Sequence, residues 1–156
     1  MASTTFGGIL RSTGDNKKTS SAGSAQLAIK FRFAHDSNGA AVVKDASDSS
    51  AVVLPAGAIV DAVYCKAALN AGTWDLGVKD YDGGADITDP DAIVDGAANN
   101  LNSMINAATS TIPGARMLDQ QTYSEQATVT ATVTGAASGN VYGVIYYHLD
   151  DNGNNS

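Results

Sequence analysis

The chain is poor in charge and in glutamate. Charged side chains make up 16% of its 156 residues, against the roughly 25% that is usual in soluble domains. Such a surface solvates a free monomer poorly, and it favours a protein packed against copies of itself or against partners. A small β-protein without a special partner is the alternative. Glu125 is the one glutamate among sixteen acidic residues, and because Asp favours turns whereas Glu favours helices, this imbalance predicts a loop-rich β fold.

A single cysteine, Cys65, excludes an intramolecular disulfide and a zinc site built from several cysteines. It ends an apolar run, so we expect a buried, unreactive thiol. No apolar run approaches the ~20 residues of a membrane span. The N-terminus shows neither the basic nor the apolar region of a signal peptide, and we therefore expect synthesis in a cytoplasm without Sec export, and no membrane partner.

Motifs for catalysis are missing as well. His35 and His148 stand without further ligand residues, no Gly-x-Ser-x-Gly sequence occurs, and no Gly-Lys loop for phosphate is present. A pair of carboxylates acting as in a glycosidase stays open as an alternative, but an aromatic content of 6% offers little surface for stacking sugars. We expect no enzyme, no cofactor and no metal.

Charge is unevenly distributed along the chain. Five basic and two acidic residues precede residue 37, whereas four basic and fourteen acidic residues follow. The acidic body argues against nucleic acid as the main partner. Residues 1–24 are slightly basic and polar with a small apolar cluster, and are either a disordered tail or an extended arm that anchors on another chain. The residues that would make this contact are Phe6, Ile9, Leu10, Arg11, Lys17 and Lys18.

Segment 51–65 organises the rest of the chain. Pro55 cannot donate to a sheet ladder and Gly57 tolerates unusual backbone angles, so we expect a turn between two apolar runs. Residues 59–67 have the β-forming composition of a strand buried on at least one face. Alternation with period two predicts further strands over 26–34, 72–78, 128–134 and 140–148. Trp74 is expected to be a core anchor.

The segments 128–134 and 140–148 are expected to be the closing pair of strands, joined by residues 135–139. Apolar side chains occupy both faces of 140–148, which indicates a central strand or an edge strand covered by a partner. Tyr142, Val144 and Tyr146 share one of these faces, and we expect that face to be a subunit interface.

Segment 79–95 holds six aspartates. Asp80, Asp82 and Asp86 have the spacing of an acidic loop that holds calcium. The glycine and the glutamate of the EF-hand pattern are both absent, and Asp-Gly corners also form plain hairpin turns. A plain turn is our interpretation, with calcium binding as the alternative.

Segment 97–108 is the one helix that the sequence predicts, because Leu101, Met104 and Ile105 have helical spacing. About seven short strands separated by turn residues predict an all-β fold, a β-sandwich of Greek-key or jelly-roll topology with at most one short helix. We expect an extended N-terminal arm over 1–24, the sandwich domain over 25–149 and a polar tail over 150–156.

Three stretches carry a resemblance to a known family: LPAGAIV at 54–60, WDLGVKDYDG at 74–83, and TVT at 128–130 followed by GNVY at 139–142. Over roughly residues 51–148 the chain resembles small structural proteins of tailed bacteriophages, most nearly the jelly-roll capsid cement (decoration) proteins. That resemblance implies a homotrimer on the outer surface of the virion capsid that clamps neighbouring major capsid subunits. The arm would then contact the capsid or a neighbouring subunit.

Two other classes of function stay open from the residues. A phage fibre, tail or head-fibre module that binds a host receptor or glycan would need exposed loop aromatics, and Tyr81 and Tyr123 are the candidates. An enzyme on a jelly-roll scaffold would need an assembled set of catalytic residues, which the sequence does not suggest.

Overall fold

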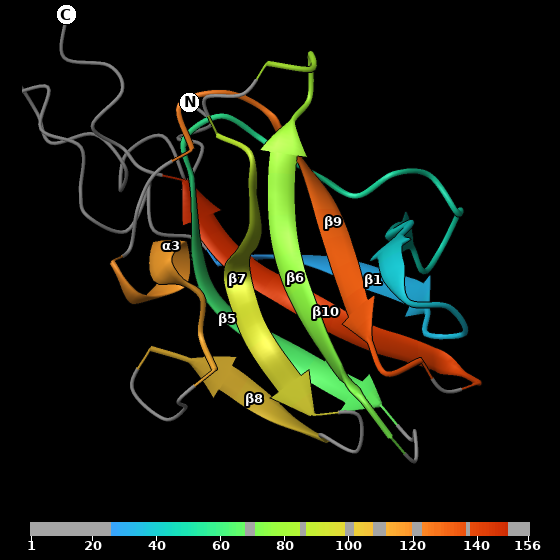
Figure 1. Cartoon of the computed structure of the whole chain (residues 1–156). Coiled ribbons are helices and arrows are strands. Elements are labelled where there is room, and N and C mark those ends of the chain that lie inside the picture. Colours follow the sequence, from blue (N-terminus) through green and yellow to red (C-terminus); the bar gives the residue numbers. More distant parts are fainter. Residues whose placement is uncertain are drawn as a thin grey trace, which may run out of the picture.

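Two antiparallel sheets form the molecule. The structure, a computed structural model, describes residues 26–67, 71–84, 87–98, 102–107, 112–119, 123–136 and 138–149. The sheets pack face to face (Figure 1), as the sequence predicts for an all-β sandwich. Sheet A has the order β3 (Lys44–Asp45), β1 (Leu27–Ala34), β10 (Asn140–Leu149), β5 (Ala58–Ala67), β8 (Asn102–Asn106). Sheet B has the order β2 (Gly39–Ala41), β9 (Ala127–Thr134), β6 (Thr73–Asp80), β7 (Asp89–Ala98), and β4 (Val53–Leu54) also pairs with β9.

Alternating side chains of both sheets fill the space between them. Phe31 and Phe33 point inward from β1, with ring centroids 6.3 Å apart, and the rings of Phe33 and Trp74 of β6 pack in a T-shaped arrangement with centroids 5.7 Å apart. Trp74 is fully buried, which confirms the prediction of a core anchor. Cys65 on β5 is also fully buried, as expected of an unreactive thiol. The core is therefore shared by the two sheets rather than belonging to either one.

The turn predicted at Pro55 and Gly57 is confirmed, and it carries the chain from one sheet to the other. Gly57 has a φ of 82°, and Ala58 N–H donates to the Pro55 carbonyl at 3.1 Å. β4 before the turn pairs within sheet B, whereas β5 after it lies in sheet A. The glycine is needed because this backbone conformation is unfavourable for residues with a Cβ.

The closing strands are confirmed as strands, but they do not pair with one another. β9 lies in sheet B beside β6, whereas β10 lies in sheet A between β1 and β5. The connection over 135–139 therefore crosses between sheets, and the expectation of a closing pair is wrong. Length and composition of a Gly-rich linker suit a crossing of this kind as well as a hairpin. The alternative of a central strand is confirmed for β10.

The helix predicted over 97–108 is wrong. Residues up to Ala98 belong to β7, and Asn102–Asn106 form β8 at the edge of sheet A. Ile105 points into the core at 1% exposure, whereas the neighbouring Met104 is 44% exposed. Adjacent positions on opposite faces follow the period of a strand, and pairing with β5 overrides the helical spacing of a short segment.

The helix that the described residues do contain is α3 (Ala115–Leu118), a single turn in a segment whose sequence looks irregular. It lies beside β5 and β7 (Figure 1), and its Met117 is buried. Just before it, Gly114 N–H donates to the Ile93 carbonyl and Asp95 N–H donates to the Ile112 carbonyl, which covers part of the outer edge of β7. No helix in the described part of the chain is long and apolar enough to cross a membrane.

Candidate interaction surface

The predicted subunit interface lies on the outer face of sheet A. Tyr142, Val144 and Tyr146 alternate with the buried Val141 and Ile145 along β10, so they point away from sheet B. Tyr142 is 47% exposed, and the other two are partly buried. The structure thus brings the three together on one face, and whether that face meets a second subunit stays a prediction.

The register of sheet A places further side chains beside Tyr142 and Val144, in two rows that cross the strands. The row through Tyr142 consists of Lys44, Arg32, Tyr142, Lys66 and Asn102, and the row through Val144 consists of Lys30, Val144, Tyr64 and Met104. We call the residues of these two rows the sheet-A face.

Positive charge is concentrated on the sheet-A face. It carries four of the six lysines and arginines in the described residues, Lys30, Arg32, Lys44 and Lys66, although the chain has a net charge of −7. Arg32 and Lys44 are direct cross-strand neighbours, an arrangement of like charges that costs stability. Within the described residues none of the four pairs with a carboxylate, and Arg32 donates instead to the Ser49 hydroxyl at 2.7 Å. An anionic partner would relieve this repulsion.

An apolar hollow of about 250 Å³ lies between these cations. Its lining consists of Lys30, Phe31, Ala46, Tyr64, Lys66, Tyr142, Gly143 and Val144. The Tyr64 hydroxyl donates to Asn102 Oδ1 at 2.8 Å, which fixes one wall. The hollow can therefore take an apolar side chain whose neighbours are acidic.

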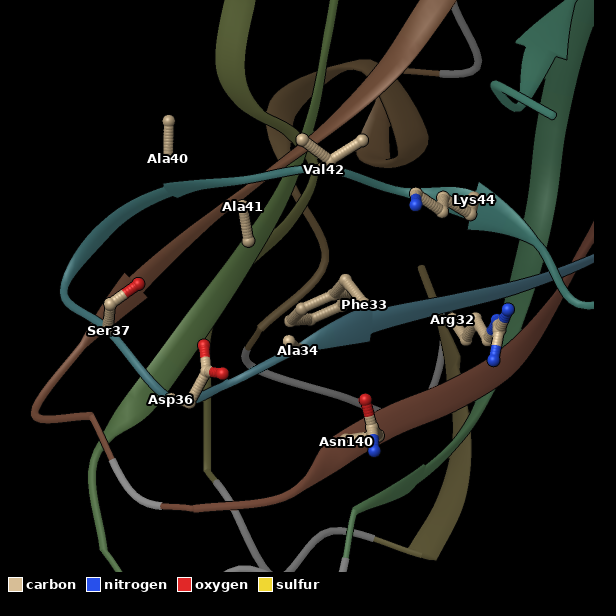
Figure 2. A pocket seen from close by; sticks show the side chains of 10 residues that line it. All are labelled: Arg32, Phe33, Ala34, Asp36, Ser37, Ala40, Ala41, Val42, Lys44 and Asn140. Atoms are coloured by element: carbon tan, nitrogen blue, oxygen red, sulfur yellow. The ribbon is translucent and has the colours of Figure 1, made fainter. Parts of the chain in front are cut away.

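A second, larger pocket of about 410 Å³ opens where the edges of the two sheets meet, between β1 and β2 (Figure 2). Figure 2 shows the Phe33 ring pointing into the space between the strands and Ala41 pointing toward it. Val42, which also lines the pocket, is 71% exposed. Nothing in the sequence pattern indicates this pocket, because its lining comes from strands of two different sheets.

The two histidines occupy different environments. His35 is fully buried, and its Nε2 lies 3.2 Å from the Thr73 carbonyl, to which it donates. His148 Nδ1 donates to Asp61 Oδ1 at 2.8 Å at the end of β10. Within the described residues no group of three or more His, Cys, Asp or Glu side chains is arranged to hold a metal ion.

The acidic segment forms a turn at residues 81–83, as our interpretation predicts, but residues 89–95 belong to strand β7, which was not predicted from the sequence. Asp82 N–H donates to Asp80 Oδ1 at 2.9 Å, and Tyr81 N–H donates to the Gln126 carbonyl at 3.1 Å. β7 then begins at Asp89, whose carboxyl pKa is raised mainly by burial. The calcium alternative also involves Asp86, which lies outside the described residues.

The two loop tyrosines considered for a glycan differ sharply. Tyr81 is 56% exposed, whereas Tyr123 is fully buried beneath the Arg116 guanidinium, which lies 5.0 Å from the ring centroid. Burial raises the pKa of the Tyr123 hydroxyl. Tyr123 also brackets the turn before β5, since its N–H donates to the Ala58 carbonyl and its carbonyl accepts from Gly57 N–H. The expectation that Tyr123 offers a surface for sugars is wrong, because a loop residue can still be part of the core.

The predicted arm contacts, Phe6, Ile9, Leu10, Arg11, Lys17 and Lys18, lie outside the described residues, as does the tail over 150–156. Their roles stay predictions.

Comparison with known proteins supports the fold. No protein-family model matches the chain. No curated protein matches it either. A solved structure titled "Capsid of Ralstonia phage GP4" contains a chain with a similar fold, at a TM-score of 0.56 and 14% sequence identity, and the alignment covers 92% of this chain and 93% of that chain. At this identity the likeness concerns the fold, and its near-complete coverage of both chains means that the sandwich as a whole is shared.

Proposed function

We propose that the chain is a structural protein of a phage virion, and more narrowly a capsid cement protein that binds the outer surface of the capsid as a homo-oligomer, a trimer by resemblance. The single observation that carries the proposal is the fold shared with a chain from a phage capsid over 92% of this chain. The exposed tyrosines of the sheet-A face support it, as do its cations, which have no carboxylate partner among the described residues, since both are suited to contact with other protein molecules.

Such a role requires no chemistry. A symmetric oligomer that bridges the seams between major capsid subunits buries additional surface, and this surface must be exposed again before the shell can open. Binding to the closed shell but not to the opened one stabilises the closed state by mass action. In this proposal the arm over 1–24 contacts the capsid or a neighbouring subunit, and Tyr142, Val144 and Tyr146 lie between subunits.

Deletion of residues 1–20 tests the assignment of the arm. Capsids assembled without this protein are mixed with the full chain or with the truncated chain, and the bound copies are counted after the capsids are pelleted. We expect the truncated chain to bind fewer copies at equal concentration, because the apolar cluster of Phe6, Ile9 and Leu10 is lost.

Circular dichroism serves as the control for that deletion, since the truncated chain should keep the β-sheet signal and melting midpoint of the full chain. Equal occupancy of both chains would remove the arm from the proposal. Absence of the full chain from purified particles, and no binding to undecorated capsids, would overturn the cement role itself.

A fibre, tail or head-fibre module that binds a host receptor or glycan is the second candidate, and the 56% exposure of Tyr81 favours it. It predicts binding of the full chain to host cells that is lost in Tyr81→Ser. Binding to capsids without binding to cells would decide for the cement role.

A further inference from the structure

The residues that line the hollow on the sheet-A face indicate what kind of group would bind there. Its lining combines the apolar surface of Phe31, Gly143 and Val144 with the rings of Tyr64 and Tyr142. Lys30 and Lys66 line it as well, and neither pairs with a carboxylate within the described residues. The complementary group is an apolar or aromatic side chain next to a carboxylate.

The turn after β6 presents such a group. Tyr81 is 56% exposed, and Asp82 beside it is exposed as well. Three backbone N–H groups donate hydrogen bonds that hold the turn: Asp82 N–H to the side-chain Oδ1 of Asp80 at 2.9 Å, Tyr81 N–H to the Gln126 carbonyl at 3.1 Å and Gly83 N–H to the Asp80 carbonyl at 3.4 Å. A side chain presented by a fixed turn loses little entropy on binding. The surrounding segment 79–95 has six aspartates and one lysine.

The hollow and the turn of one molecule cannot meet. The turn follows β6 of sheet B and projects beyond the end of the sandwich (Figure 1). The sheet-A face points away from sheet B, on the far side of the core. Any contact between the two therefore involves two molecules.

We propose that Tyr81 of one copy inserts into the hollow of a second copy, with Asp82 facing Lys30 and Lys66. This contact joins two different surfaces, so its repetition closes into a ring when the rotation between copies allows it. The inference rests on the proposed function in that it names what covers the predicted subunit face.

The overall charge favours a second copy over a nucleic acid. Outside the sheet-A face, the described residues carry twelve acidic side chains against Lys79 and Arg116. A polyanion long enough to extend past the four cations of the face would be repelled by the rest of the molecule. A second copy instead brings a short acidic turn to the face together with an aromatic anchor, Tyr81.

Sedimentation velocity of the full chain tests the contact. We expect wild-type protein to self-associate, and to do so less at high salt because the contact includes opposite charges. Tyr81→Ser removes the anchor, and Lys30→Glu with Lys66→Glu reverses the charge at the hollow. Each change should weaken association by about 30-fold or more, the loss expected of a central interface residue. The matched controls are Tyr81→Phe and Lys30→Arg with Lys66→Arg, which should associate like the wild type.

A mixing experiment identifies the two halves of the contact. The Tyr81→Ser chain keeps an intact hollow, and the Lys30→Glu, Lys66→Glu chain keeps an intact turn. Each alone should be monomeric, and their mixture should form a one-to-one dimer that grows no further, because the remaining surfaces are both disabled.

The inference is overturned if the wild type is monomeric at about 100 µM, if association survives both changes, or if the mixture forms no dimer. Binding of a single-stranded oligothymidylate that is lost in the Lys30→Glu, Lys66→Glu chain, without self-association of the wild type, would assign the face to nucleic acid instead. Capsids are absent from this experiment, so its failure is distinguishable from failure of the cement role. A chain that binds capsids as a monomer keeps that role and refutes the contact.

Discussion

At the scale of single residues, the thiol of Cys65 shows how the core controls reactivity. The thiol is enclosed between the sheets and its Sγ–H donates to the Ser103 carbonyl at 3.6 Å. Burial raises the pKa of Cys65 to about 11, from an ordinary value of 9.0. The neutral thiol is therefore the form that the folded state accommodates, and the thiolate is not.

We therefore expect ionisation of the Cys65 thiol to lower the free energy of unfolding at alkaline pH. Because the pKa is raised on folding, the contribution of Cys65 is fully present below pH 9 and is lost as the pH rises toward 11. We expect the difference in unfolding free energy between wild type and Cys65→Ala to shrink by roughly 2 kcal/mol over that interval. Urea unfolding at several pH values measures it, and the Cys65→Ala chain is the control for tyrosines and lysines that titrate in the same range. A difference independent of pH would contradict the prediction.

At the scale of elements, the packing of β1 against β10 depends on the absence of a side chain at Gly143. A Cβ at this position would lie 2.5 Å from Phe31 Cζ and 2.5 Å from the Tyr64 carbonyl oxygen. Neither neighbour yields easily, since one is a core ring and the other is backbone.

Gly143→Ala should therefore destabilise the protein by about 2 kcal/mol or more, the cost of overpacking a closely packed core. Chemical denaturation followed by circular dichroism measures the change. Ala28→Val is the matched control, because it adds methyl groups at an exposed position of β1 and should stay within about 0.5 kcal/mol of the wild type. A Gly143→Ala chain as stable as the wild type would show that the two strands can separate without cost.

Some of the strands could be predicted from the sequence, and others could not. Strong alternation identifies β1, β6, β9 and β10, and the Pro55 turn follows from residue chemistry. The strand β8 is missed, because five residues with Met104 and Ile105 adjacent satisfy a helical and an extended pattern equally well. The extended form is chosen because the backbone of β5 pairs with β8, and the sequence of β8 alone gives no sign of this pairing.

At the scale of the whole molecule, the pairing of strands determines which residues of different strands share a face, and the sequence alone does not show this. Lys30 and Arg32 are visibly on one face of their strand, but Lys44 and Lys66 join them only through the register of sheet A. The same applies to β9 and β10, which are consecutive yet lie in different sheets. The predicted interface residues were recognisable as one face of β10, whereas the surrounding cations and the hollow were not.

Because both sheets share one core, we expect the sandwich to unfold as a single cooperative unit. Trp74, the one tryptophan of the chain, lies in sheet B and touches Phe33 of sheet A, so its fluorescence reports on the contact between the sheets. Its transition in urea should coincide with the loss of β-sheet signal in circular dichroism. Separate midpoints for the two signals would show that the sheets melt independently.

The borders of the two sheets have a consequence for storage and handling. Sheet A ends in the two-residue β3 on one side and the five-residue β8 on the other, sheet B ends on one side in the three-residue β2, and its other edge strand, β7, is partly covered by residues 112–114. Short or covered edge strands expose few unpaired backbone N–H and C=O groups with which another chain could form β-sheet hydrogen bonds. A protein with so few charges would otherwise be prone to fibril growth at high concentration. Because its edge strands are short or partly covered, we expect its concentrated solutions to stay free of amyloid.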